Sequence, residues 1–336
     1  MVFEPDKLKY TMDQKFRFIC RIKEAHYIIL ACSFEFQRRK LMHKVAVITD
    51  STSRIPEKLK GDLPIFTLPL IVTVEGKPYR EGVEISLDEF YRKLPTLRDF
   101  PTTSRPSPED YISLFQEAFE QADSLVMITI SSKISATYEG AVVAARNFPG
   151  KQIEVIDSRQ LAMAHGWQVV AAARAAKAGL SFKEVVEIAH LVKERSHVCF
   201  MADTLDYLYK GGRITGVSHL VGSLLKIKPV IAMEEGELKL IGKVRSRRLG
   251  IEEMISWMER VLNGGNIAEL SLINVLAPEL TQELKEEISS HFGLPKEEIL
   301  DDTASVIIGA HCGPGTAGPN FYSAVPGFPG GIVKFT

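Results

Sequence analysis

Strand-like and helix-like patterns alternate along the chain from residue 44 onward, and this alternation limits the fold more than any other feature of the sequence. The run SLVMITI at 124–130 has the apolar character of a buried strand, and residues 137–147 after it have a helical pattern. A further strand is expected at 152–157 and a further helix at 159–178. Because strands that alternate with helices usually pair in parallel, the sequence predicts a parallel α/β sheet covered by helices.

The pattern changes in the second half of the chain. The apolar runs 228–233 and 238–244 flank the turn Glu235-Gly236, which is typical of an antiparallel hairpin. The elements expected to follow are helices at 248–262 and 279–291 and strands at 267–276 and 304–309. The predicted fold class is therefore α/β with two domains: a parallel Rossmann-like sheet domain followed by a mixed α+β domain, with a ligand between them.

This change of pattern sets the expected domain boundaries. The parallel α/β domain is expected at 44–205 and the mixed α+β domain at 206–320. Residues 1–43 mix basic, aromatic and methionine residues without a clear period, so we expect a poorly ordered N-terminal extension. Residues 321–336 are expected to form a C-terminal tail.

Composition argues against several classes of protein. The formal net charge of −1 argues against a nucleic-acid-binding protein, which would carry a basic excess. No apolar run reaches the length of a membrane span and no signal-peptide pattern is present, so a cytoplasmic location is expected. The four cysteines form no CxxC pair, and no cluster of Asp, Glu and His has metal-ligand spacing, so no metal site is expected.

Hydroxyl-bearing residues occur where the buried strand 124–130 gives way to a helix. The loop at this point is SSKISATY, residues 131–138. Such a junction directs free backbone N–H groups and the positive end of the helix dipole toward one point, and serine and threonine hydroxyls add neutral donors. The phosphate-binding patterns GxxxxGK[ST] and GxGxxG are absent. The loop therefore indicates a site for a small anionic group such as a carboxylate, with a serine N-cap as the alternative.

Three further loops are candidates for the same site. They are TTSRPS at 102–107, KGGRI at 210–214 and HCGPG at 311–315. Two glycines allow a sharp turn that fixes Arg213, and the Gly-Pro-Gly turn fixes the direction of His311. An ordinary turn, a helix C-cap with a surface arginine and a structural histidine are the alternatives that stay open. The basic cluster KVRSRR at 243–248 would form either a solvated face or a surface for an anionic group or acidic partner.

Taken together, these loops resemble the DegV family, whose better-known members include the FakB fatty-acid-binding proteins. Each motif alone is weak, but the set is highly specific because it occurs in the family's order over about residues 44–318. The matching motifs are DSTS at 50–53, TSRPSPED at 103–110, ISSKISATY at 130–138, VIDS at 155–158, DTLDYLYKGGRI at 203–214, IKPV at 227–230, KVRSR at 243–247 and HCGPG at 311–315.

The resemblance implies a DegV-like fold that buries a long-chain fatty acid between two domains. The residues it implies for the carboxylate are Thr103, Ser104, Ser132, Ser135, His311 and Arg213. It also implies that Arg245 and Arg247 present the acyl group to a partner, a FakA-type (DAK-like) kinase that makes acyl phosphate for phospholipid synthesis. On this basis the chain would have no catalytic residues and no cofactor besides its fatty-acid ligand, and transient contact with a membrane surface stays open.

Two positions depart from the family pattern. Ala136 stands where the family usually has glycine, so the extra methyl group would either crowd the headgroup or require a different backbone angle. Arg105 stands where glutamine is usual, and it would either add a charge near the site or point to solvent.

Two other functions compete with that of a carrier. An acyl transferase or hydrolase would use Ser135 or Cys312 with His311, although adjacent residues on an extended chain point to opposite sides. A regulator would bind an acyl ligand and contact a protein partner through residues 245–248. The carrier ranks first because the loops offer anion donors without a recognisable means of activating a nucleophile.

Overall fold

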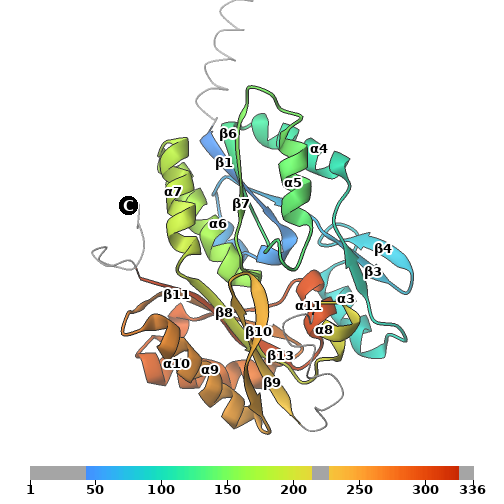
Figure 1. Cartoon of the computed structure of the whole chain (residues 1–336), viewed down its shortest axis with the longest axis vertical. Helices are drawn as coiled ribbons and strands as arrows, with labels where there is room; N and C mark the ends of the chain where they lie inside the picture. Colours follow the sequence, from blue (N-terminus) through green and yellow to red (C-terminus); the bar gives the residue numbers. More distant parts are fainter. Residues whose placement is uncertain (1–42, 214–226, 325–336) are drawn as a thin grey trace, which may run out of the picture. The chain divides into compact units, whose positions relative to one another are not determined.

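The computed structural model describes residues 43–213 and 227–324 (Figure 1). The expected N-terminal extension lies outside the described residues apart from His43, and so do residues 325–336 of the expected tail. Within the described ranges, no helix has both the length and the apolar character that crossing a membrane requires.

A four-stranded parallel sheet forms the first half of the fold. Its strand order is β2-β1-β6-β7, and every neighbouring pair is parallel. The strands are β1 (His43–Asp50), β2 (Ile65–Leu68), β6 (Ala122–Thr129) and β7 (Gln152–Asp157). Helices α4 (Pro108–Phe119) and α5 (Thr137–Ala145) pack on one face, and α6 (Ala162–Lys177) and α7 (Phe182–Lys193) pack on the other (Figure 1). The predicted parallel α/β half is confirmed.

The central strands of this sheet are buried on both faces. In β1, Ala46 and Ile48 pack with α4 and α5, whereas Val45 and Val47 pack with α6 and α7. Successive side chains of a strand point to opposite faces, so a strand covered by helices on both sides must be apolar at almost every position. This explains why the sequence of β6 is nearly continuous in apolar residues instead of alternating.

A six-stranded mixed sheet forms the second half. Its order is β10-β9-β8-β13-β11-β12, and all pairs are antiparallel except β11–β12. The strands are β8 (Ser196–Met201), β9 (Lys228–Glu234), β10 (Glu237–Val244), β11 (Ile267–Val275), β12 (Leu300–Thr303) and β13 (Thr316–Ser323). Helices α9 (Arg247–Leu262) and α10 (Pro278–Phe292) cover one face. The predicted hairpin is the antiparallel pair β9–β10.

Helix α6 lies between the two sheets. It contacts β1 of the parallel sheet and β8, β11 and β13 of the mixed sheet, and nearly all of its residues are buried. Because sheets approach it from two sides, small side chains are needed along it, which explains the alanines among residues 171–176. The Nε1–H of Trp167 donates to the carbonyl oxygen of Asn320 at 3.0 Å and ties the helix to β13.

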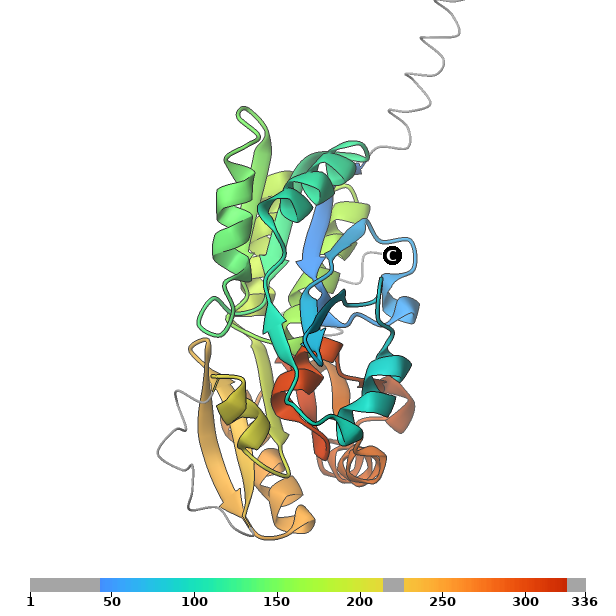
Figure 2. The same cartoon turned by 90° about the vertical axis from the view of Figure 1, so that its right-hand side faces the viewer.

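A small antiparallel sheet and three short helices complete the region that holds the candidate site. The sheet order is β4-β3-β5. These elements are β3 (Ile71–Val74), β4 (Lys77–Arg80), β5 (Thr102–Ser104), α3 (Leu87–Lys93), α8 (Asp206–Lys210) and α11 (Val306–Cys312). Helix α11 packs against β3, β5, α3 and α8, and Figure 2 shows α11 (red) beside β5 (teal). The remaining short helices are η1 (Ser51–Ser53), α2 (Glu57–Lys60), η2 (Leu94–Thr96) and η4 (Lys296–Glu298).

The strand expected at 304–309 is wrong, because most of this segment belongs to helix α11. Ser305 is the N-cap of the helix, and its Oγ accepts a hydrogen bond from the N–H of Ile308 at 3.1 Å. A short apolar run does not distinguish a buried strand from a buried helix, and here the N-cap serine favours the helix.

Two strands of the mixed sheet do not follow the expected boundaries. Strand β8 precedes residue 206, yet it pairs with β9 and β13 of the mixed sheet. Strand β13 crosses the boundary between residues 320 and 321 and pairs with β11 and β8. A local pattern identifies a strand but not its partners, which depend on contacts between residues distant in the sequence.

Candidate functional site

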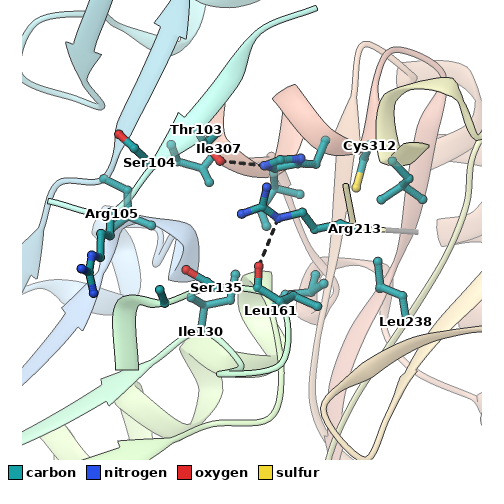
Figure 3. A pocket seen from close by; sticks show the side chains of 16 residues that line it. Thr103, Ser104, Arg105, Ile130, Ser135, Leu161, Arg213, Leu238, Ile307 and Cys312 are labelled. Carbon is teal, nitrogen blue, oxygen red and sulfur yellow. Dashed lines mark hydrogen bonds between the residues drawn. The ribbon is translucent and has the colours of Figure 1, made fainter. Parts of the chain in front are cut away.

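Five of the six residues expected to bind the carboxylate line one cavity. The cavity has a volume of about 200 Å³ and lies where the loop after β6 meets β5, the end of α8 and helix α11 (Figure 3). The five residues are Thr103, Ser104, Ser135, Arg213 and His311. The fold thus brings together loops that are far apart in the chain, since Thr103 and His311 are separated by 208 positions.

Ser135 lies at the strand–helix junction that the sequence indicates. Its Oγ is 2.8 Å from Oγ1 of Thr137, the first residue of α5, and accepts a longer hydrogen bond from the N–H of Thr137 at 3.3 Å. The N–H of Ser135 donates to the carbonyl oxygen of Ser131 at 3.1 Å. These bonds hold the half-buried hydroxyl at the wall of the cavity, where it can also donate to a ligand.

A neutral histidine faces Thr103. His311 lies near the C-terminal end of α11, and its Nε2 is 2.7 Å from Oγ1 of Thr103. Burial, with a smaller contribution from the charge of Arg213, lowers the pKa of His311 to about 4. The imidazole is therefore uncharged at neutral pH, and within the described residues its Nδ1 has no hydrogen-bond partner. The pair gives the cavity a hydroxyl and a ring nitrogen without adding a charge.

Arg213 brings a partly buried positive charge to the cavity. Its Nη1 donates to the carbonyl oxygen of Gly211 at 2.7 Å, and its Nε donates to that of Ile134 at 3.2 Å (Figure 3). Burial lowers the pKa of Arg213 from its usual value, because an ion loses hydration away from water. No carboxylate of the described residues lies within ion-pair distance of this guanidinium. An anionic ligand would supply the missing counter-charge.

The two glycines before Arg213 have different roles. Gly212 has a φ of +70°, a left-handed conformation that favours glycine. Gly211 has an ordinary φ of −75°, but a Cβ at this position would overlap the imidazole ring of His311. The pair therefore permits both the turn that leads to Arg213 and the close packing of the chain against His311.

Ser132 is the one expected carboxylate-binding residue that does not line the cavity. Its Oγ donates to Oδ2 of Asp157 at 2.6 Å, and its N–H donates to Oδ1 of the same carboxylate at 3.1 Å. Asp157 is the last residue of β7. Ser132 thus ties the loop to the neighbouring strand.

Arg245 and Arg247 also lie outside the cavity lining. Arg245 is exposed between the end of β10 and the start of α9. Arg247 is the first residue of α9, and its Nη1 is 2.9 Å from Oε1 of Glu283 on α10. Of the two, Arg245 therefore has the guanidinium that is more open to a partner.

Apolar side chains form most of the remaining wall, and the sequence motifs do not single them out. They are Leu70, Ile130, Ile134, Leu161, Leu208, Leu238, Ile307 and Ile308. Part of this set has a signal in the sequence. Ile307 and Ile308 precede His311 by four and three positions, so all three lie on one side of a helix. This spacing identifies Ile307 and Ile308 as neighbours of His311 only if residues 306–312 are first recognised as a helix.

The geometry does not favour the transferase or hydrolase alternative. Burial raises the pKa of Cys312 to about 12, so the thiol is protonated at neutral pH. Ser135 is bonded to Thr137, whereas Nε2 of His311 faces Thr103. An activated nucleophile needs a base within hydrogen-bond reach and a group that orients the base. Neither Ser135 nor Cys312 has this arrangement with His311 among the described residues.

Both residues that depart from the family pattern, Ala136 and Arg105, line the cavity. Ala136 is the N-cap residue of α5 and has φ −82° and ψ 15°, so its methyl group requires no left-handed backbone. Arg105 lines the cavity but is exposed, and Figure 3 shows its side chain turned away from Arg213. Solvent screening therefore limits the effect of its charge on a ligand.

Known proteins match most of this chain. The family model described as "Uncharacterised protein, DegV family" matches residues 44–324. A DegV domain-containing protein of Caldanaerobacter subterraneus is 35% identical over 280 residues, which cover 83% of this chain and 99% of that protein. A DegV domain-containing protein of Listeria innocua is 34% identical over 276 residues, which cover 82% of this chain and 97% of that protein.

Solved structures share the fold. A DegV family protein from Thermus thermophilus, described by its fatty acid binding, has a TM-score of 0.77 at 33% identity, with coverage of 83% of this chain and 99% of that one. DegV from Bacillus subtilis, described as a fatty acid binding protein, has a TM-score of 0.74 at 27% identity, with coverage of 84% and 99%. The sequence matches and the shared fold together show that this chain belongs to the DegV family.

Proposed function

We propose that this DegV protein binds a long-chain fatty acid in the cavity of Figure 3 and presents the carboxylate to a partner kinase. The observation that carries the proposal is the chemistry of the cavity wall, which is apolar except for hydroxyls, a thiol, a neutral imidazole, the partly buried Arg213 and the exposed Arg105. In Figure 3 the hydroxyl-bearing Thr103 and Ser135 lie toward one side of the cavity, with Ile307 and Ile130 beside them, and Leu238 and Cys312 lie toward the other. A ligand with one anionic end and one apolar end matches this division.

The polar side meets the needs of a buried carboxylate. A carboxylate removed from water is costly unless several donors and a nearby cation replace its hydration. The hydroxyls of Thr103 and Ser135 can donate to its oxygens, and the guanidinium of Arg213 supplies the charge. The fatty-acid binding described for the relatives from Thermus thermophilus and Bacillus subtilis, and the stearic acid named for a relative from Eubacterium ventriosum, support the same ligand class here.

The cavity volume of about 200 Å³ is below the range of about 300–1,000 Å³ that is usual for small-molecule sites. A long acyl chain therefore needs more room than this conformation offers. We expect leucine side chains of the wall, such as Leu161 and Leu238, to change rotamer as the acyl chain of the ligand enters.

The direct test is to identify what the purified protein carries. We expect mass spectrometry of organic extracts to detect a long-chain fatty acid in stoichiometric amount. Delipidated protein is expected to take up added long-chain fatty acid saturably, because the proposed donors Thr103, Ser135 and Arg213 already line one cavity. Protein that is consistently empty and takes up none would contradict the proposal.

Replacing Ser135 by alanine is expected to weaken fatty-acid retention by about 10- to 100-fold, because a hydrogen bond to a charged group contributes about 1.5–3 kcal/mol. Ser132→Ala is the matched control. It also removes a hydroxyl from this loop, but the hydroxyl of Ser132 donates to Asp157 and does not face the cavity. Its effect on affinity is expected to stay below about threefold. Equal losses in the two variants, measured by calorimetry on delipidated protein, would remove Ser135 from the site.

The kinase part of the proposal rests on the resemblance to FakB proteins and on the exposed guanidinium of Arg245. Arg245 and Arg247 are the proposed presenting residues. Arg247 is engaged by Glu283, so its replacement is expected to have the smaller effect.

Arg245→Ala is expected to slow acyl-phosphate formation by about tenfold when a FakA-type kinase and ATP are supplied, with unchanged fatty-acid affinity. The reason is that the residue lies outside the cavity lining and can act only on the partner or its phosphates. Arg248→Ala is the control, because Arg248 is exposed nearby and is paired with Glu252 on the same helix. Loss of fatty-acid binding in Arg245→Ala, or an equal slowing in the control, would refute the assigned role.

A further inference from the structure

A second cavity, with a volume of about 370 Å³, lies beside β2, from which Ile65 and Thr67 line it, and its lining shares no residue with the cavity of Figure 3. It is bounded by η1, α2 and the loop after β4. Its volume falls in the usual range for small-molecule sites. The two cavities lie on either side of one short segment, since Pro69 lines the second cavity and Leu70 lines the first.

The wall of the second cavity carries two cations. Arg54 has a φ of 45°, which is uncommon for a residue with a side chain and places it in a turn directly after η1. Within the described residues its guanidinium makes a single hydrogen bond, from Nη2 to Oδ1 of Asp302 at 3.4 Å, although it has five N–H donors. Lys60, the last residue of α2, lines the same cavity and has no ion pair among the described side chains. The Nε of Arg54 is buried without a partner among the described residues, so the Nη donors of Arg54 and the ammonium of Lys60 are the ones left for an oxyanion.

The rest of the wall limits the charge and the character of a ligand. Glu57 lines the cavity, and Asp302 is paired with Arg54, so these two carboxylates offset the two cations. Glu81 is a third acidic side chain of the wall, and burial raises its pKa to about 7, so it adds little negative charge below that pH. The oxygens of the buried Glu81 are taken by Ser51 Oγ and by the N–H of Val306. A near-neutral surrounding of this kind suits a monoanion better than a dianion such as a phosphate.

Apolar side chains face the same space. Ile55, Ile65 and Leu87 line the cavity, and Val83, which also lines it, is 65% exposed. A large exposed aliphatic side chain beside two cations is suited to cover the apolar part of a ligand whose charged end is held by the cations.

We propose that this cavity is a second ligand site, for a short-chain organic monocarboxylate held by Arg54 and Lys60 with its alkyl part against Ile55, Ile65 and Val83. The proposal is independent of the fatty-acid site, because no lining residue is shared.

Amide NMR titration of the full chain, loaded with a long-chain fatty acid so that the first cavity is occupied, tests the proposal. Butyrate is the probe, and 1-butanol and inorganic phosphate are the two controls. We expect butyrate to shift the amide signals of Arg54 and Val83 saturably, with a Kd tighter than about 1 mM, and the two controls to bind at least about tenfold more weakly. Shifts confined to Ser135 and Thr103, equal binding of 1-butanol or phosphate, or no saturation would overturn it.

Variants separate the cations of the cavity from neighbouring charges. Arg54→Asn is chosen because asparagine tolerates the left-handed backbone, and Lys60→Gln keeps a helix-forming residue. Each is expected to weaken butyrate binding about tenfold. Lys58→Gln on the same helix, outside the cavity lining, and Asp302→Asn, which removes only the ion pair of Arg54, are expected not to weaken it. Unchanged affinity in Arg54→Asn, with an unchanged melting temperature, would also refute the site.

Discussion

Replacing Arg213 by glutamine is expected to weaken fatty-acid binding by about 30- to 1000-fold. The guanidinium is partly buried, and within the described residues its only partners are the carbonyl oxygens of Gly211 and Ile134. A bound carboxylate would be its counter-ion in a medium that screens poorly, so removing the cation leaves a buried anion without a counter-charge. Such losses are about 2–4 kcal/mol, which gives the expected factor. Calorimetric titration of delipidated protein measures it.

Arg105→Gln is the matched control, because Arg105 lines the same cavity with an exposed side chain. Its charge is screened by solvent, so the loss of affinity is expected to stay below about fivefold. A long-chain alcohol of equal length provides a second comparison. The wild-type protein is expected to prefer the acid, and Arg213→Gln is expected to bind acid and alcohol almost equally. If Arg213→Gln keeps both the affinity and the preference, the carboxylate does not lie at this guanidinium.

The fold could be predicted wherever a pattern is local and strong. The strand expected at 124–130 is β6 and the helix expected at 279–291 is α10, each displaced by no more than two residues at either end. A strand buried on both faces and an amphipathic helix each leave a periodic trace in their own residues. The segment 304–309 leaves no such trace, because a helix whose residues are all buried, as in α11, is apolar around its whole circumference.

The candidate site could be predicted as a set of loops but not as a geometry. Ser132 and Ser135 are equivalent in the sequence of their loop, and only the position of Asp157 at the end of the neighbouring strand separates them. Gly211 and Gly212 are likewise equivalent in sequence, yet one is required by the approach of His311 and the other by its backbone angle. Both distinctions depend on residues far away in the chain, which no local pattern contains.

A buried carboxyl group, Glu81, connects helix α11 to the turn after β1. Its Oε2 accepts a hydrogen bond from Ser51 Oγ at 2.6 Å, and its Oε1 accepts one from the N–H of Val306, the first residue of α11. Burial raises the pKa of Glu81 to about 7, and the two hydrogen bonds offset only part of this rise. The same helix carries His311, so the protonation of Glu81 bears on an element of the proposed fatty-acid site.

The raised pKa makes the stability of the protein depend on pH in a definite direction. The folded state binds the proton of Glu81 more tightly than the unfolded state does. Protonated Glu81 therefore contributes its full stabilisation of the fold below the ordinary pKa of 4.5, and this contribution is lost as the pH rises through about 7. Because one pKa unit corresponds to about 1.4 kcal/mol, the difference amounts to about 3 kcal/mol. Glu81→Gln removes the ionisation and keeps an amide oxygen for Val306 and an N–H for Ser51.

We therefore expect Glu81→Gln and the wild-type protein to have similar free energies of unfolding near pH 4.5, and the variant to be more stable by about 3 kcal/mol above pH 7. Denaturant titrations at a series of pH values measure both curves. Glu84→Gln is the control, because Glu84 lies on the same loop but is exposed, so its curve should follow that of the wild type within about 0.5 kcal/mol. Parallel curves for Glu81→Gln and the wild type between pH 4.5 and 8 would mean that the carboxyl is solvated in the folded protein, because burial is the largest cause of its raised pKa.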